Sequence, residues 1–159
     1  MNPDGGVAFF DRQFQQQVQN RDFQLNPFEL TALPYLKGRV LDFGCGLGNL
    51  AIAAAQQGCS VVALDGSHPA IEHLRQRAAA ESLPVEAIEA DSRTHEIGED
   101  FDCVVSIGLL MFFDCATALR VLALLQAHVR PGGIAAINVL AEGTTYLDMF
   151  QPGYYCLFA

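Results

Sequence analysis

Residues 41–49 have the sequence Leu-Asp-Phe-Gly-Cys-Gly-Leu-Gly-Asn, with glycine at positions 44, 46 and 48. Glycine adopts left-handed backbone angles at little cost and has no side chain, so this run can turn tightly and bring its main-chain N–H groups against a ligand. A short apolar segment, 40–43, precedes the glycines, and an alanine-rich segment, 49–57, follows them up to Gly58. The sequence therefore predicts a buried strand, a glycine loop and a helix in direct succession.

The same alternation of apolar runs and amphipathic segments continues along the chain. It predicts an α/β fold with a doubly wound, mostly parallel sheet of Rossmann-like type and helices on both faces. Right-handed crossovers then favour the strand order 3-2-1-4-5, with a ligand crevice outside the carboxyl ends of the first and fourth strands. Further strands are expected at 60–65, 85–90, 102–107 and 134–140, and helices at 69–80 (cap Ser67 or His68) and 114–130 (cap Asp114), with Pro131-Gly132-Gly133 as a sharp turn.

The first 38 residues predict helices that precede the sheet. Phe10 and Phe14 have the spacing of one helical face within residues 7–24. Asn26 is a typical N-cap and Pro27 a typical first helical residue, and we expect that second helix to end near Lys37 and Gly38. We therefore divide the chain into N-terminal helices that cover the ligand site (1–38), a ligand-binding core (39–140) and a C-terminal segment (141–159).

Composition narrows the classes of function. The chain has 159 residues, of which 51% are hydrophobic and 17% charged, which fits one domain with a real core. A net charge of −9 with a single lysine disfavours a nucleic-acid partner and favours a small-molecule substrate. No apolar run reaches the ~18–20 residues of a membrane span, and no leader pattern opens the chain, so we expect a cytoplasmic protein without a membrane partner.

The five cysteines include no Cys-x-x-Cys pair and lack the short spacing of zinc ligands. We therefore expect reduced, mostly buried thiols and no metal site.

An acidic residue stands at the end of each of the first three expected strands. Asp42 precedes the glycine loop, where a carboxylate suits a cation and repels a pyrophosphate. The loop also lacks the G-x-G-x-x-G spacing of dinucleotide sites. Asp65, 17 residues after Gly48, could accept from two ribose hydroxyls, and Asp91 from the amino group of adenine. Together they predict a site for a neutral adenosine and a cationic methionine, which is S-adenosylmethionine, unless Asp65 and Asp91 serve only as turn or cap residues.

The chain resembles the class I S-adenosylmethionine-dependent methyltransferases, and among them the tellurite-resistance TehB-like group. The resemblance extends over 26–140 and rests on 41–48, Asp65, Asp91, the Ser-Ile-Gly-Leu-Leu-Met-Phe-Phe run at 106–113 and Arg-Pro-Gly-Gly at 130–133. It implies a methionine end lined by Gly44, Cys45 and Gly46 above Asp42, a ribose held by Asp65 beside Gly66 and Ser67, adenine near Asp91 and Ser92, and a sulfonium near Ser106 and Ile107.

The segment after the fourth expected strand bears on the methyl acceptor. It lacks the Asn/Asp-Pro-Pro-aromatic pattern of enzymes that methylate exocyclic amino groups, and its apolar residues 109–113 suit a soft acceptor such as a thiol, a selenium or a tellurium compound. Such acceptors need little general base, for which His95 is the one candidate. Two alternatives stay open: an NAD(P)-dependent oxidoreductase on the same fold, and a cofactor-binding module without activity.

The resemblance also implies a longer C-terminus, since the family continues with a helix and an antiparallel hairpin. Here the last six residues allow at most one more strand, and we expect a shortened chain that lacks the C-terminal strands of the sheet. The fifth strand would then present an edge that a second copy of the chain could cover.

Overall fold

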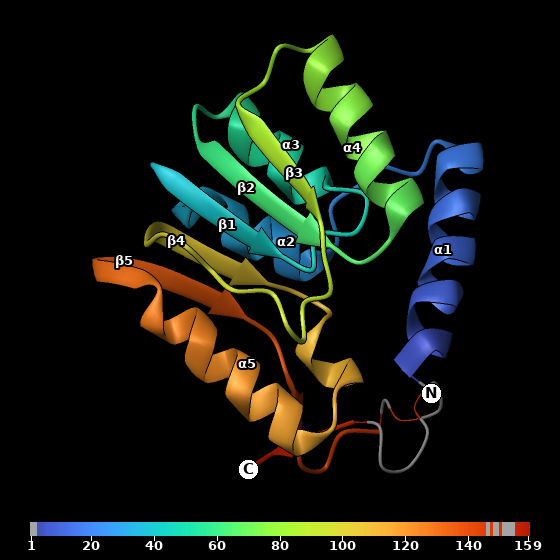
Figure 1. Cartoon of the computed structure of the whole chain (residues 1–159), viewed down its shortest axis with the longest axis vertical. Coiled ribbons are helices and arrows are strands. Elements are labelled where there is room, and N and C mark those ends of the chain that lie inside the picture. The colour runs from blue at the N-terminus through green and yellow to red at the C-terminus, as the bar shows by residue number, and fades with distance from the viewer. Residues whose placement is uncertain (1–2, 146, 148–149, 151–154) are drawn as a thin grey trace.

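Five parallel strands form the centre of the protein (Figure 1). The computed structural model describes residues 3–145, 147, 150 and 155–159, with side chains from residue 10 onward. The strand order is β3-β2-β1-β4-β5, which confirms the predicted order, and every neighbouring pair is parallel. The strands are β1 (Arg39–Phe43), β2 (Ser60–Asp65), β3 (Val85–Glu89), β4 (Phe101–Ser106) and β5 (Val129–Ile137).

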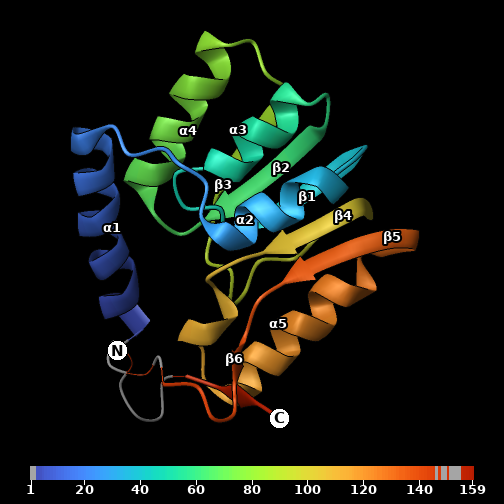
Figure 2. The ribbon, with the colours of Figure 1, turned by 180° about the vertical axis from the view of Figure 1, so that it is seen from behind.

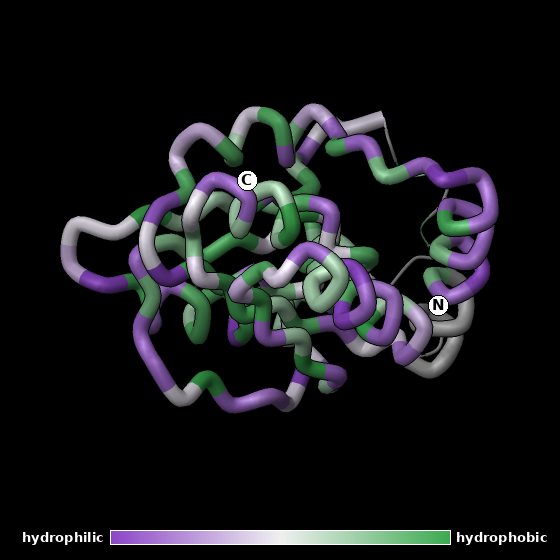
Figure 3. Tube along the Cα trace, turned by 90° about the horizontal axis from the view of Figure 1, so that it is seen from above, coloured by the Kyte–Doolittle hydropathy of each residue, from purple (hydrophilic) through white to green (hydrophobic). Residues whose placement is uncertain are grey.

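Helices cover both faces of this sheet, as predicted. α3 (Asn49–Gln56) and α4 (His68–Ala80) pack on one face, and α5 (Cys115–Ala127) packs on the other (Figures 1 and 2). Val40 of β1 belongs to the apolar cluster on the first face, whereas Phe43 belongs to the cluster on the second. The central strands are therefore apolar on both faces because both faces are buried. In Figure 3 hydrophobic residues concentrate between the layers, and hydrophilic residues predominate on outer turns and loops.

The N-terminal helices are α1 (Pro3–Asn20) and α2 (Pro27–Ala32). Asn26 caps α2 as predicted: its side-chain oxygen accepts from two backbone N–H groups, and the carboxylate of Glu29 accepts from the backbone N–H of Asn26 at 2.7 Å. The prediction that this helix extends to Lys37 and Gly38 is wrong. Pro34 cannot donate an intrahelical hydrogen bond, and the chain instead forms the 3₁₀ turn η1 (Leu33–Tyr35).

The chain between α5 and β5 also differs from the prediction. α5 ends at Ala127, three residues early, and the segment predicted as a sharp turn at 131–133 lies inside β5. There the pairing with β4 shifts register, because Phe101 pairs with Val129 while Cys103 pairs with Ile134. A proline and two glycines are tolerated here because the segment is a bulge in a strand at the edge of the sheet.

The C-terminal segment returns to the base of α5. β6 (Leu140–Ala141) pairs in parallel with β7 (Leu157–Phe158), so the end of the chain forms one short strand, which pairs with β6 and not with the main sheet. Of the last six residues, position 154 lies outside the described residues. Within the described strands, β5 pairs with β4 alone.

A disulfide joins Cys115, at the start of α5, to Cys156. The expectation of five reduced thiols is therefore wrong for this pair, whereas Cys45, Cys59 and Cys103 are free. The spacing of 41 residues gave no indication of the pair, since only the return of the chain along β6 brings Cys156 to α5. Among the helices that the structure describes, none has both the length and the apolar character of a membrane span.

Candidate functional site

The glycine loop after β1 makes the predicted tight turn. Gly44, Gly46 and Gly48 all have positive φ, at 85°, 52° and 70°. The loop is fixed to the next strand, because the N–H groups of Gly44 and Cys45 both donate to the carbonyl of Leu64, at 2.8 and 2.9 Å. Glycine is required by this conformation, in which the loop passes from the sheet into α3 within a few residues.

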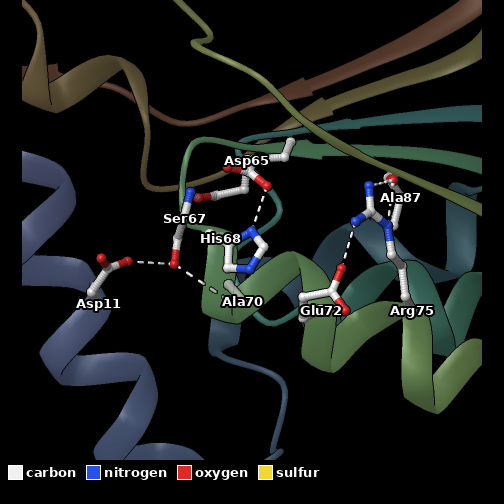
Figure 4. Close-up of polar contacts among 9 residues, drawn as sticks. Asp11, Asp65, Ser67, His68, Ala70, Glu72, Arg75 and Ala87 are labelled. Atoms are coloured by element: carbon white, nitrogen blue, oxygen red, sulfur yellow. Dashed lines mark hydrogen bonds and ion pairs between the residues drawn. The ribbon is translucent and has the colours of Figure 1, made fainter.

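Asp65, at the end of β2, joins this loop to the next one. One carboxylate oxygen accepts from the backbone N–H of Gly46 at 2.8 Å, and the other accepts from that of Ser67 at 2.9 Å (Figure 4 shows Asp65 beside Ser67). Burial raises the pKa of Asp65, and these hydrogen bonds partly oppose the shift. Gly66, between the two, is exposed. A carboxylate has about four acceptor positions, so Asp65 retains the capacity to accept from a ligand.

Asp42, at the end of β1, is the most strongly perturbed acid of the site. Only 5% of the residue is exposed, and its Oδ2 atom has no hydrogen-bond partner among the residues that the structure describes. Burial raises its pKa to about 8, with further contributions from the carboxylates of Glu29 and Asp65 and a partial offset by the backbone N–H of Ala51. A buried acid whose oxygen lacks a hydrogen-bond donor is suited to bind a cationic donor, which would stabilise its ionised form.

The thiol of Cys45 lies next to the same carboxylates. Burial raises its pKa well above the ordinary value, and the charges of Asp42 and Asp65 add to the effect. The thiol is therefore protonated at neutral pH, which fits a small packing residue and not a nucleophile.

Asp91 occupies a different environment. It follows β3 beside the end of β2, since the N–H of Ala90 donates to the carbonyl of Asp65 at 3.0 Å. Its carboxylate is exposed and accepts from Arg93, with Nη2 at 2.8 Å, and Arg93 lowers its pKa. Ser92 lies in the same turn, and the N–H of His95 donates to the carbonyl of Asp91 at 2.9 Å. The structure thus brings Asp42 and Asp65 together and leaves the Asp91 carboxylate on Arg93, a geometry that fits a turn residue.

The end of β4 holds a second unpartnered polar group. Ser106 is fully buried, and its Oγ atom has no hydrogen-bond partner within the described part of the chain. Ile107 is half-buried and packs against the core. The loop that follows is held by Asn138, whose side-chain oxygen accepts from the N–H of Gly108 at 2.7 Å. The sequence reasoning missed Asn138, although a polar residue inside the expected apolar strand 134–140 could have indicated it.

α1 lies against both loops. The hydroxyl of Ser67 donates to Asp11 at 2.5 Å (Figure 4), and a Cβ atom at Gly46 would lie 3.0 Å from the ring of Phe14. Asp11 and Phe14 were also missed, because nothing in the helical pattern of α1 shows which loops it contacts. A cavity of about 320 Å³ between α1 and α4, lined by Phe14, Leu47, His73 and neighbouring residues, adjoins the loop.

A parallel sheet of this order, with a glycine loop after the first strand and an acid after the second, defines a Rossmann-like ligand-binding domain. The sequence also matches a family model described as a methyltransferase domain over residues 40–133. The chain belongs to this methyltransferase family, which confirms the predicted resemblance.

Individual relatives support the assignment. The malonyl-[acyl-carrier protein] O-methyltransferase of Salmonella typhimurium is 32% identical over 148 residues, covering 91% of this chain and 57% of that protein. A structure from work on the conversion of a disulfide bond into a thioacetal group during echinomycin biosynthesis is 33% identical, with a TM-score of 0.61 over 73% of this chain and 51% of that one. TehB from Haemophilus influenzae has a TM-score of 0.70 at 21% identity, covering 79% of this chain and 44% of its own, which supports a likeness of fold. The chain spans 31% to 57% of the length of four curated relatives.

Proposed function

We propose that the chain binds S-adenosylmethionine at the carboxyl ends of β1 and β2 and transfers its methyl group to a small molecule. The observation that carries the proposal is the buried side chain of Asp42, whose Oδ2 atom has no hydrogen-bond partner among the described residues, beneath a loop of left-handed glycines that is hydrogen-bonded to Asp65. This arrangement suits the cationic methionine portion beside a neutral ribose. The pyrophosphate of NAD(P) would meet the same carboxylates, which disfavours the oxidoreductase alternative.

We propose that successive parts of the cofactor contact the loops that follow successive strands of the sheet. Asp42 lies beneath the methionine portion, and Asp65 accepts from the ribose hydroxyls. α1, whose Phe14 already lies against Gly46, covers the cofactor together with α2. The remaining contacts that we propose are Gly44, Cys45 and Gly46 at the methionine portion, Gly66 and Ser67 at the ribose, Asp91 and Ser92 at adenine, and Ser106 and Ile107 near the sulfonium.

The acceptor that we propose is a soft nucleophile such as a thiol. In the transfer, the bond between sulfur and the methyl carbon breaks as the bond to the acceptor forms, and the main requirement is to align the two partners and exclude water. The apolar segment after β4, with Leu110 fully buried and Met111 half-buried, suits an acceptor of this kind. The relative connected with thioacetal formation, a reaction at sulfur, supports the same class.

Binding and turnover test the proposal separately. Isothermal titration with S-adenosylmethionine, S-adenosylhomocysteine and NADH should show saturable binding of the first two and none of NADH. Methyl transfer from labelled cofactor to a thiol acceptor should follow. Binding without turnover on thiol, selenite or tellurite acceptors would favour the inactive module, and tight NADH binding would contradict the assignment.

Replacement of Asp65 by alanine should weaken S-adenosylhomocysteine binding by ~1–3 kcal/mol, because it removes an acceptor for the ribose and leaves backbone donors without a partner. The dissociation constant from titration calorimetry measures the effect. Asp91→Ala gives a comparison at the proposed adenine contact: its exposed carboxylate is already paired with Arg93, so we expect a smaller loss. An unchanged affinity of Asp65→Ala would show that the ribose lies elsewhere.

A further inference from the structure

A buried hydroxyl connects α1 to the loop after β2. The side chain of Ser67 donates to the carboxylate of Asp11 at 2.5 Å, a length typical of a hydroxyl on an ionised acid (Figure 4). Ser67 is only 2% exposed, and its hydroxyl also accepts from the N–H of Ala70 as the cap of α4. Because the two partners are 56 positions apart, this hydrogen bond fixes α1 to a distant part of the chain.

α1 and Asp65 connect the same two loops. Asp65 accepts from the backbone N–H groups of Gly46 in the glycine loop and of Ser67 in the loop after β2. On α1, Asp11 accepts from Ser67. Phe14, three residues further along the helix, lies against Gly46, where a Cβ atom would be 3.0 Å from the ring. Residues three apart share one face of a helix, so this face of α1 rests on both loops that we assign to the cofactor.

The rest of the contact between α1 and α4 is loosely packed. A cavity of about 320 Å³ lies between the two helices, lined by Val18 of α1 and Pro69 of α4, and Val18 remains 36% exposed. Side chains that line a cavity lose dispersion contacts on that side. We therefore expect the hydrogen bond of Asp11 to contribute a large share of the attachment of α1, beside the ring contact of Phe10 with Phe112 at 4.9 Å between centroids.

We propose that Asp11 is a positioning residue for cofactor exchange. Through Ser67 it holds α1 across the two loops, and this hydrogen bond breaks each time the cofactor enters or its product, S-adenosylhomocysteine, leaves. The inference rests on the proposed function, because a nucleoside that lies on both loops and beneath α1 can leave only when the helix separates from at least one of them. The same hydrogen bond breaks on the way in and on the way out, so its removal should speed both steps and change the affinity much less than either rate.

Surface plasmon resonance with S-adenosylhomocysteine measures both rates. In Asp11→Ala we expect association and dissociation to be about tenfold faster, as for the loss of one hydrogen bond to a charged group, with a dissociation constant within about threefold of the wild type. A residue with a merely structural role would not accelerate the two rates together. Asp11→Asn keeps an acceptor oxygen for Ser67, and both rates should be only about threefold faster, because a neutral acceptor forms a hydrogen bond about half as strong.

Two further variants show whether the effect passes through Ser67. Gln13→Ala is the matched control, since Gln13 is exposed on the same helix, and it should leave both rates unchanged. In a Ser67→Ala background, Asp11→Ala should have no further effect on either rate, because the donor of the hydrogen bond is already absent.

Limited digestion with trypsin reports on α1 directly. Arg12 is exposed within α1, and the bond after it can be cleaved only when the helix has separated and unfolded, because a single detached helix is unstable in water. Cleavage after Arg12 should be faster in Asp11→Ala than in Gln13→Ala. Saturating S-adenosylhomocysteine should slow it in the unaltered protein.

Three results would overturn the inference: wild-type rates in Asp11→Ala, a change of its dissociation rate alone, or no protection of Arg12 by S-adenosylhomocysteine in the unaltered protein. The last of these needs no variant, so it decides the matter even if a substitution prevents folding. Failure of the proposed function gives a different pattern. S-adenosylhomocysteine then binds to none of the proteins, while cleavage after Arg12 without ligand still differs between Asp11→Ala and Gln13→Ala.

Discussion

The variant Asp42→Asn is expected to have a higher free energy of unfolding than the wild type at pH 7, by about 4 kcal/mol. The pKa of Asp42 is about 8 in the folded protein, against an ordinary value of 3.8. Between these values the folded chain retains a proton that the unfolded chain has lost. Unfolding therefore releases a proton, and the wild-type stability falls as the pH rises from about 4 to about 8. Asparagine resembles the neutral acid in shape and has no such pH dependence.

Urea denaturation at pH 4, 5.5, 7 and 8.5 measures this effect. The two proteins should have similar stability at pH 4 and diverge as the pH rises. Asp102→Asn is a control in which the pKa shift has the opposite sign. Hydrogen bonds from the Arg39 backbone and from Arg130 lower the pKa of Asp102, so removal of this carboxylate should not stabilise the protein at pH 7. An Asp42→Asn variant with the wild-type pH profile would contradict the assigned pKa. Asp42→Asn should also bind S-adenosylhomocysteine poorly. A substitution that stabilises the fold and weakens binding is expected where a residue serves the binding site at a cost in stability.

The sheet and its order could be predicted because the information is local and repeated. The segments 40–43 and 60–65 are apolar on both faces, which requires burial between two layers, and the handedness of the crossovers then leaves few topologies. The caps of the helices are equally local. Asn26, Ser67 and Asp114 each accept from a backbone N–H two or three residues ahead, as their residue types predict.

The candidate site could be predicted only in part, because a sequence shows where an acid stands but not what surrounds it. In the sequence, Asp42, Asp65 and Asp91 each stand at the end of an expected strand. In the structure the first two lie close together and are desolvated, whereas the third is exposed and paired with Arg93. The arginine two residues further on could have indicated this difference, since it can reach back to the carboxylate within the turn.

Contacts between distant segments were beyond the sequence argument. Glu29 fits the local pattern of a capping box so well that its electrostatic effect on Asp42 had no separate signal. Cys115 and Cys156 depend in the same way on the path of the C-terminal segment. In each case the local sequence accounts for the residue on its own, and its interaction with a distant residue depends on how the helices and strands pack together.

The variant Gly48→Ala is expected to lose about 2–5 kcal/mol of unfolding free energy, from two sources. Its φ of 70° is left-handed, which costs an alanine ~1–2 kcal/mol. The new Cβ atom would also lie 2.5 Å from a methyl carbon of Leu74 in α4, and overpacking of this kind costs ~1–3 kcal/mol. Because Leu74 is fully buried, it has little room to move away. Urea denaturation of the variant measures the total.

Gly58→Ala separates the two sources. Gly58 also has a positive φ, of 97°, but a Cβ atom there meets nothing within 4 Å, so this variant should show the backbone cost alone. The excess loss in Gly48→Ala is then the cost of the contact with Leu74, and it should shrink when Gly48→Ala is made in a Leu74→Ala background, where the methyl groups are gone. Equal losses at Gly48 and Gly58 would show that the loop can move away from α4.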